Sequence, residues 1–189
     1  RQIPAEIYRE TMKCFTRFLE ECKKKHGQMF FDRGWWTFRQ ISLNIFRIGA
    51  LEYQPDRYEG KPAISIHIPS DADFNAAAVD ASLKQAVSFF QTYFGETDYE
   101  NYICSSWLLS PALTPLLSEG SRILSFQRRF EVKEVKPEGK EYVEWLYQAP
   151  ADTPAEKLPA VTSLQKKVKE LVLRGGSVGS ALGVLRPDA

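Results

Sequence analysis

Hydrophobic and polar residues alternate along this chain with two periods, one typical of strands and one of helices. The helical period is clearest over residues 75–94, where apolar side chains recur every three or four positions behind Asn75, a good N-cap. The predicted helices lie, in chain order, at 4–25, 75–94, 111–117, 141–148 and 163–174. The predicted strands lie at 40–48, 50–54, 61–68, 101–107, 122–135 and 177–185. This order predicts an α/β (α+β) fold, a mixed sheet flanked by helices with an N-terminal helix before it.

Glycine and proline residues set the expected turns between these elements. Gly49 predicts a tight bend between the first two strands, and Pro55 and Gly60 are expected to bracket the next turn. The three strands before the long helix would then form an antiparallel meander. Residues 141–148 fit a strand as well as a helix, and the helix is the slightly better fit.

Composition excludes several classes of protein. The 189 residues are 43% hydrophobic and carry a net charge of +1, which supports a real core and gives no global signal for nucleic acid or an acidic membrane. No apolar run approaches the roughly 20 residues of a membrane span, and we expect a cytoplasmic protein. We expect residues 1–34 to form an N-terminal helix and aromatic linker, which could be the end of a preceding region. We expect residues 35–189 to form the main unit of the fold, a single domain.

An aromatic segment at residues 28–38 requires a place to bury its side chains. The simplest interpretation is a loop or short helix packed on the sheet, and the alternative is a lid or a partner surface. The three cysteines, Cys14, Cys22 and Cys104, show no disulfide framework, which is typical of reduced thiols. With two histidines and no Cys/His cluster along the sequence, we expect no metal site.

Candidate chemistry gathers where the strand 61–68 meets an acidic turn and the helix that starts near Asn75. His67, near the end of that strand, could act as a general base, because the ordinary pKa of histidine lies near neutrality. The alternative is a structural histidine bonded to the following turn. Cys104 could be a nucleophile activated by His67, although an inert buried cysteine fits it better.

The ends of two later strands supply further candidates. Ser105 and Ser106 could donate hydrogen bonds to an acyl oxygen, or could bond backbone where their strand ends. Trp107 is expected in the core or in the wall of a ligand cleft. Gln127 and Arg128 fall in the middle of the predicted strand 122–135, where polar side chains need a ligand, a partner or water.

Several short runs resemble the GNAT-like C-terminal domain of bacterial acyltransferase domain-containing proteins, within the GNAT N-acyltransferase superfamily. The resemblance covers residues 35–185 and is carried by these runs: Phe46-Arg47-Ile48-Gly49-Ala50-Leu51, His67-Ile68-Pro69, Ser106-Trp107-Leu108-Leu109-Ser110-Pro111, Phe126-Gln127-Arg128-Arg129-Phe130, Thr162-Ser163-Leu164-Gln165 and the Gly175-Gly176 pair before the last strand. In that family a helical N-terminal region precedes the domain.

The resemblance implies transfer of an acyl group from acyl-CoA to an amine. It implies that the pantetheine arm lies between the strands 61–68 and 101–107. The pyrophosphate would sit at the helix N-terminus, near Ile68, Pro69, Ser70 and Asn75, with His67 as the base and no metal. Expected partners are the small-molecule amine acceptor and the chain's own N-terminal region.

The turn itself departs from the family pattern. GNAT enzymes carry glycines here, whereas this chain has none between residues 67 and 74 and has two carboxylates, Asp71 and Asp73. Those carboxylates would repel a phosphate, or would stabilise the helix dipole. An alternative function therefore stays open, a non-catalytic module that binds a small molecule or another protein region and has lost the CoA-binding turn.

Overall fold

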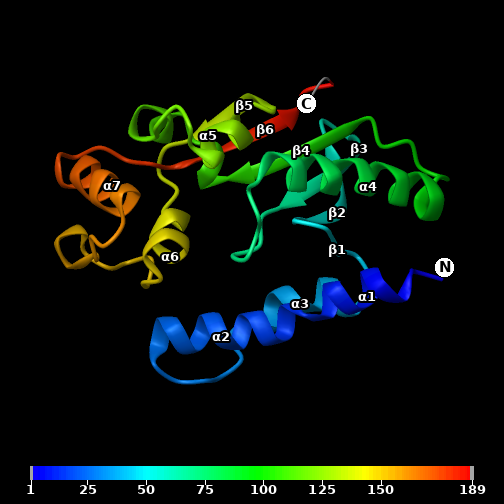
Figure 1. Cartoon of the computed structure of the whole chain (residues 1–189), viewed down its shortest axis with the longest axis horizontal. Coiled ribbons are helices and arrows are strands. Elements are labelled where there is room, and N and C mark those ends of the chain that lie inside the picture. The colour runs from blue at the N-terminus through cyan, green and yellow to red at the C-terminus, as the bar shows by residue number, and fades with distance from the viewer. Residues whose placement is uncertain (1, 188–189) are drawn as a thin grey trace. The chain divides into compact units, whose positions relative to one another are not determined.

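Three strands form the antiparallel meander that the sequence predicts. They are β1 (Phe46–Ile48), β2 (Leu51–Tyr58) and β3 (Lys61–His67). They lie in the first of two units of the computed structural model, which describes residues 2–187; the first unit ends at Ile103 and the second begins at Cys104. Figure 1 labels the elements of both units.

The six strands are hydrogen-bonded in the order β1-β2-β3-β4-β6-β5, so the chain forms the expected mixed sheet with helices. Strand β4 (Asn101–Ser106) runs parallel to β3, whereas β2 is antiparallel to both of its neighbours, β1 and β3. A parallel neighbour requires a crossover, and helix α4 (Ala76–Phe94) supplies it.

Helix α4 packs on one face of the meander and forms its apolar core. Its N-cap is Asn75, whose side chain accepts a hydrogen bond from the Ala77 amide at 3.0 Å, as predicted. The buried Ser82 hydroxyl lies 2.8 Å from the Tyr53 hydroxyl and accepts from the Leu51 amide at 3.3 Å. The ring of Phe46 on β1 lies among three phenylalanine rings of α4.

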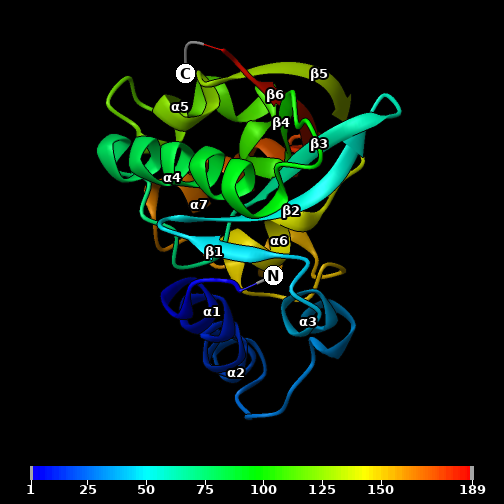
Figure 2. The same ribbon diagram turned by 90° about the vertical axis from the view of Figure 1, so that its right-hand side faces the viewer.

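Three helices cover the opposite face of the meander: α1 (Ala5–Met12), α2 (Cys14–His26) and α3 (Gly34–Ile41). Figure 2 shows them on the side of β1 and β2 away from α4. The single helix expected over 4–25 is divided at Lys13, and Pro4 is the N-cap rather than the first helical residue. Gly27 ends α2 with φ +70°, a left-handed cap that glycine adopts without strain.

The predicted strand 40–48 is wrong over its first part, because Gln40 and Ile41 end helix α3 and only 46–48 are extended. Thr37 and Gln40 are buried one turn apart on that helix, while Ile41 is exposed. Leu43 then adopts φ +53° and reverses the chain. The alternation of Ile41, Leu43 and Ile45 therefore imitates a strand without forming one.

The turn expected at Pro55 is also wrong, since β2 continues through it to Tyr58. Strand β1 pairs with β2 only as far as Tyr53, so Pro55 lies where the outer edge of β2 is unpaired among the described residues. Proline is tolerated there because its missing N–H costs no ladder hydrogen bond. The turn lies instead at Glu59 and Gly60, which both have positive φ.

The predicted strand 122–135 is wrong in its first half. Residues 122–127 form helix α5 (Arg122–Gln127), which is capped by the Ser121 side chain, and strand β5 (Phe130–Lys136) follows. Leu124 and Phe126 are buried on α5, so the apolar positions that suggested a strand pack from a helix. Tertiary packing decides between the two structures in such a short segment.

The second unit otherwise follows the prediction closely. It contains the 3-10 helices η1 (Trp107–Leu109), η2 (Pro111–Leu116) and η3 (Ala155–Lys157), helices α6 (Glu141–Tyr147) and α7 (Ser163–Leu173), and strand β6 (Ser180–Leu185). Ser110 caps η2, and Thr162 with Gln165 forms a capping box at the start of α7. A Cβ added to Gly183 of β6 would lie 2.9 Å from Phe130 and 3.0 Å from Leu109, which explains the need for a small residue there.

Across residues 2–187, the helices are too short or too polar to cross a membrane.

Candidate functional site

His67, the proposed base, is the last residue of β3 and is half-buried beneath helix α3. Its Nε2 lies 3.1 Å from Oε1 of Gln54 on β2. The indole of Trp36 meets the imidazole edge-on, with ring centroids 5.1 Å apart, and the guanidinium of Arg39 lies 4.2 Å from the centroid of the Trp36 ring. The imidazole is therefore held by β2 and α3, rather than by the turn that follows it.

This environment keeps His67 neutral. Burial is the main cause that lowers the pKa of His67 to about 4, and the positive charge of Arg39 contributes in the same direction. Because the amide oxygen of Gln54 can only accept, the hydrogen bond assigns the proton to Nε2 and leaves the lone pair on Nδ1. The neutral imidazole has a free lone pair at neutral pH, but a pKa of about 4 makes it a weaker proton acceptor than an ordinary histidine.

The turn after β3 is held from the N-terminal helices. The Ser70 hydroxyl donates to Glu21 of α2. Asp71 forms ion pairs with Arg47 of β1 at 3.0 Å and with Arg17 of α2 at 3.5 Å. Two guanidinium groups therefore face the carboxylate that the sequence suggested would repel a phosphate.

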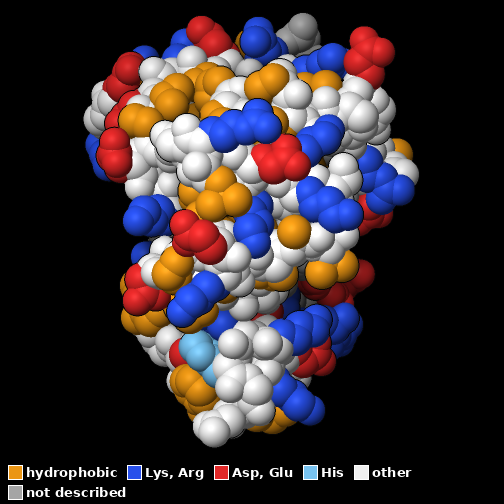
Figure 3. All heavy atoms as spheres, turned by 90° about the vertical axis from the view of Figure 1, so that its left-hand side faces the viewer, with side chains coloured by type: hydrophobic (Ala, Val, Ile, Leu, Met, Phe, Trp, Pro, Cys, Tyr) orange, Lys and Arg blue, Asp and Glu red, His pale blue; other side chains and the backbone are white. Residues whose placement is uncertain are grey.

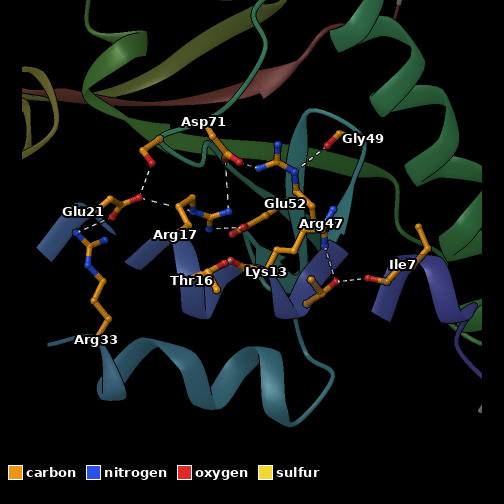
Figure 4. A network of polar contacts seen from close by, with 12 residues as sticks. Ile7, Lys13, Thr16, Arg17, Glu21, Arg33, Arg47, Gly49, Glu52 and Asp71 are labelled. Carbon is orange, nitrogen blue, oxygen red and sulfur yellow. Dashed lines mark hydrogen bonds and ion pairs between the residues drawn. The ribbon is translucent and has the colours of Figure 1, made fainter. Parts of the chain in front are cut away.

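Figure 4 shows the charged network of which this turn is a part. Its centre is the pair of Arg17 and Glu52, 2.6 Å apart, with only 11% and 6% of their side chains exposed. Glu21 extends it to Arg33, at 3.1 Å, next to α3. Burial lowers the pKa of Arg17, but the carboxylates of Glu52, Asp71 and Glu21 outweigh that effect and raise the pKa overall. Arg17 therefore stays charged and links α2 to both β2 and the turn.

The N-terminus of α4 is closed by local side chains. Asp73 accepts a hydrogen bond from the Asn75 amide at 2.8 Å, and Asn75 accepts from the Ala77 amide. Of the other residues predicted to contact the cofactor, Pro69 is buried and Ile68 is half-buried. The turn is thus shaped by Asx-type bonds where GNAT enzymes use glycines.

The parallel pairing of β3 with β4 is short. Its register runs from Ala63↔Asn101 to Ser65↔Ile103, while β3 continues to His67 and β4 continues to Ser106. The two strands therefore share three paired positions near their N-terminal ends.

In the second unit, Ser105 is exposed on β4 and Ser106 ends the strand. The Ser106 oxygen accepts from the Leu108 amide at 3.1 Å, which caps η1 and leaves the hydroxyl proton able to donate. Trp107 is almost completely buried at the start of η1. Cys104 is completely buried, and burial raises its pKa to about 12, so at neutral pH it is a thiol rather than a nucleophilic thiolate.

Gln127 and Arg128 lie at the end of α5, so their predicted placement in the middle of a strand is wrong. The Gln127 amide donates to the carbonyl oxygens of Leu108 at 2.7 Å and Ser110 at 3.3 Å. It holds the backbone just after Trp107, whereas Arg128 is exposed to solvent. Of the two, Gln127 is the one linked to the segment that follows Ser105 and Ser106.

Sequence reasoning missed Arg17, Glu52 and Gln54, the partners of the site in the first unit. Two signals could have found the charged pair. Glu52 interrupts the apolar run from Ala50 to Tyr53, and Arg17 adjoins Phe18 on the buried side of α2. A charge in an apolar setting normally has a partner.

Comparison with known families gives two matches. Residues 45–185 match the GNAT-like C-terminal domain, and residues 1–43 match the N-acyltransferase N-terminal domain. Among the curated proteins, no match was found.

Solved acyltransferase structures share this fold. One, in complex with decanoyl-CoA and teicoplanin, has a TM-score of 0.89 and 26% identity, covering 97% of this chain and 59% of its own. A second, in complex with CoA and 10C-teicoplanin, has a TM-score of 0.89 and 25% identity over the same shares. A third, with decanoyl-CoA, has a TM-score of 0.88 and 26% identity, and 58% of its own chain is covered. This chain thus spans less than two thirds of their length.

Proposed function

The chain belongs to the family of the GNAT-like C-terminal domain, and from that premise we propose that it is part of an N-acyltransferase that transfers an acyl group from acyl-CoA to an amine. The observation that carries the proposal is the likeness, over 97% of this chain, to an acyltransferase in complex with decanoyl-CoA. The acceptor would be a small molecule with an amine, as the co-complex of a related structure with teicoplanin suggests by analogy.

For the acyl-CoA, we assign the turn after β3. Ile68, Pro69, Ser70 and Asn75 would contact the cofactor near its pyrophosphate, close to the N-terminus of α4. The sequence suggested that the acidic turn would repel a phosphate. The repulsion from Asp71 is reduced because its carboxylate is paired with Arg17 and Arg47. The network that holds Asp71 contains three guanidinium groups, of Arg17, Arg33 and Arg47, and three carboxylates, of Glu21, Glu52 and Asp71, so its net charge is zero and does not repel an anion.

For the chemistry, we assign His67 as the base and Ser105 or Ser106 as donors to the acyl oxygen. The amine nitrogen attacks the thioester carbonyl carbon, the carbon–sulfur bond breaks, and the leaving thiolate of CoA takes up the proton that the amine has given to His67. His67, which is neutral at physiological pH, accepts the proton that the amine loses. In the second unit, Trp107, Gln127 and Arg128 would bind the acyl chain or the acceptor, with Gln127 acting through the backbone that it holds.

The test is calorimetric titration of the full-length protein and of this chain with decanoyl-CoA, acetyl-CoA and CoA. We expect decanoyl-CoA to bind the full-length protein saturably, with 1:1 stoichiometry. The substitution His67→Ala should reduce the rate of turnover more than it reduces the affinity for decanoyl-CoA. Binding with no turnover on any amine-containing acceptor would contradict the enzymatic role. Absence of heat with every thioester would contradict acyl-CoA binding itself.

The alternative function is a non-catalytic module that binds a small ligand or a protein region. The observation that favours it is the lack of glycine between residues 67 and 74, since a phosphate approaches backbone most closely at glycine. Ligand binding that is unaffected by CoA, together with no turnover by the unaltered protein, would favour this alternative over the enzyme.

We also propose that an aromatic surface contacts another region of the same protein, on its N-terminal side. This aromatic surface consists of Met29, Phe30, Phe31, Trp35, Phe38 and Ile41, which are each between 40% and 69% exposed. Figure 3 shows hydrophobic side chains at the lower end of one face of the molecule. Hydrogen exchange of residues 29–41 should be slower in the full-length protein than in this chain, and equal exchange would contradict the contact.

A further inference from the structure

A cysteine, a histidine and an aspartate outside the proposed acyl-transfer site lie close together. The ligand atoms of Cys22, His26 and Asp32 are all within 4.8 Å of one another. His26 Nε2 lies 3.9 Å from an oxygen of Asp32. Cys22 and His26 lie one turn apart on α2, so their side chains project from the same face of the helix.

The loop between α2 and α3 folds back to bring Asp32 to this face. Gly27 reverses the chain, and the carbonyl oxygen of Gln28 then lies 3.7 Å from the Cys22 sulfur. The ring of Phe30 lies over His26, with centroids 5.3 Å apart. The buried Cys22 sulfur therefore points toward the loop and the other two ligand atoms, rather than into the core of the first unit.

The donor set selects the class of ion. A thiolate, an imidazole nitrogen and a carboxylate together suit Zn²⁺ and similar divalent transition metals, whereas Mg²⁺ and Ca²⁺ prefer oxygen donors throughout. A tetrahedral zinc site with bonds of about 2.0–2.3 Å places its ligand atoms roughly 3.3–3.6 Å apart. The side chains of His26 and Asp32 are 34% and 25% exposed, so both can rotate by the small amount that this contraction requires.

Asp32 also has an unused acceptor. Its Oδ1 is enclosed and has no hydrogen-bond partner among the described residues; its nearest cation is Nε of Arg33, at 3.9 Å. An enclosed carboxylate oxygen without a hydrogen bond is costly. Oδ2 is the oxygen that lies 3.9 Å from His26, so an ion would satisfy Oδ1 if the carboxylate bound it through both oxygens.

We propose that Cys22, His26 and Asp32 form a binding site for a zinc-class divalent metal ion, with solvent in the fourth position. Binding converts the Cys22 thiol to a thiolate and releases one proton, while neutral His26 binds through Nε2. The ion fastens the loop before α3 to α2. Since α3 carries Trp36, which contacts His67, the ion also steadies the helix that covers the proposed base. The sequence predicts no metal site because it shows no Cys/His cluster, and Asp32 is separated from Cys22 and His26 along the chain. Only the fold of the loop brings the three side chains together.

The experiment uses Co²⁺ as a spectroscopic probe and Zn²⁺ as a competitor, with the full chain in its reduced state. We expect one equivalent of Co²⁺, a thiolate-to-Co²⁺ charge-transfer band in the near ultraviolet, and displacement of Co²⁺ by one equivalent of Zn²⁺. At about a hundredfold excess of free Zn²⁺ over its Kd, thermal unfolding should shift upward by roughly 5–10 °C.

His26 and Asp32 are partly exposed, so their variants should keep the fold, whereas Cys22 is buried. His26→Asn and Asp32→Asn should each weaken Co²⁺ binding at least tenfold, and Cys22→Ser should abolish the charge-transfer band. Glu20→Gln removes an exposed carboxylate from the same helix, and Cys104→Ser removes a thiol elsewhere; both should keep the band and the stoichiometry. Circular dichroism of each variant reports whether it is folded.

A thiolate band that persists in Cys22→Ser, or binding that is unchanged in both His26→Asn and Asp32→Asn, would overturn the proposal. So would the absence of 1:1 binding in the unaltered chain. None of these outcomes bears on acyl-CoA binding, which is measured separately by calorimetry.

Discussion

The two faces of β2 and β3 come from the same alternating strands but have opposite chemistry. Toward α4, Tyr53 and Ile66 are completely or almost completely buried in an apolar core whose polar contacts converge on Ser82. Toward the N-terminal helices, Glu52 pairs with Arg17, and Gln54 bonds to His67. The registers Tyr53↔Ile66 and Glu52↔His67 place neighbouring residue pairs on opposite faces.

The apolar face mainly stabilises the fold, whereas the polar face holds the residues of the proposed site. The apolar face gains from burial in proportion to area, so almost any well-packed hydrophobic set would serve. The polar face depends on particular partners, because a buried charge without its partner is strongly unfavourable. The proposed base and the turn after β3 both belong to this second kind of face.

The largest effect should come from breaking the buried ion pair. Arg17→Met leaves the Glu52 carboxylate, which is 6% exposed, without its partner, and should lower the free energy of unfolding by about 3–5 kcal/mol. Urea denaturation measures this loss, with the exposed Arg9→Met as the matched control. The double variant Arg17→Met/Glu52→Leu should recover much of the stability; a double variant as unstable as the sum of both single variants would refute the pairing.

On the apolar face, Ile66→Ala should cost about 2–5 kcal/mol of unfolding free energy, because it removes a buried side chain and leaves a cavity against α4. Ile41→Ala, at a site that is 64% exposed, is the control and should change stability by about 0.5 kcal/mol or less. Similar effects at the two positions would mean that this face is not the core of the first unit.

The pH dependence of stability tests His67 on the polar face. Its pKa is about 4 in the folded chain and near 6.5 when unfolded, so between these values the unfolded chain binds the proton more tightly. The contribution of neutral His67 to the free energy of unfolding is therefore fully present above pH 6.5. As the pH falls toward 4, the free energy of unfolding should decrease by about 2–3 kcal/mol. In His67→Gln, the decrease over this window should be smaller by that amount; an identical pH profile would contradict the burial of the imidazole.

The smallest effect on stability should come from Asp71→Asn, since that carboxylate is 59% exposed and its ion pairs are screened by solvent. We expect a change in unfolding free energy of about 1 kcal/mol or less. Decanoyl-CoA should bind a few-fold more tightly, because the network of Arg17, Arg33, Arg47, Glu21 and Glu52 would then carry one net positive charge. Asp56→Asn in β2 controls for the loss of one charge, and equal effects of both variants on binding would argue against a phosphate near the turn.

Much of the fold could be predicted because its signals are local. The Asn75 cap, the Gly27 cap and the capping box of Thr162 and Gln165 are bonds between residues near in sequence, and each lies where the pattern places it. The meander followed from strand-like runs and the Gly49 bend. The prediction is wrong for short segments whose structure depends on packing. An example is α5, whose apolar residues fit a strand equally well.

The candidate site could be predicted only in part. The sequence identifies His67 as a polar residue at a strand end, but not Gln54, which is 13 residues away and joined to it only by strand register. Nor could it show that Asp71 faces Arg17, 54 positions earlier, so that an apparently repulsive turn is neutralised. Such contacts depend on the tertiary arrangement of α2 over the sheet, which periodicity does not encode.

The place of Pro55 has a consequence for association between molecules. Beyond Tyr53 the outer edge of β2 carries backbone groups that β1 does not pair, and an open edge can recruit a strand from another chain. Pro55 removes one donor from that edge, and the exposed charges of Asp56 and Arg57 follow it immediately. These three residues protect the hairpin arm against edge-to-edge aggregation, so Pro55→Val should leave the fold intact and make the protein more prone to self-association.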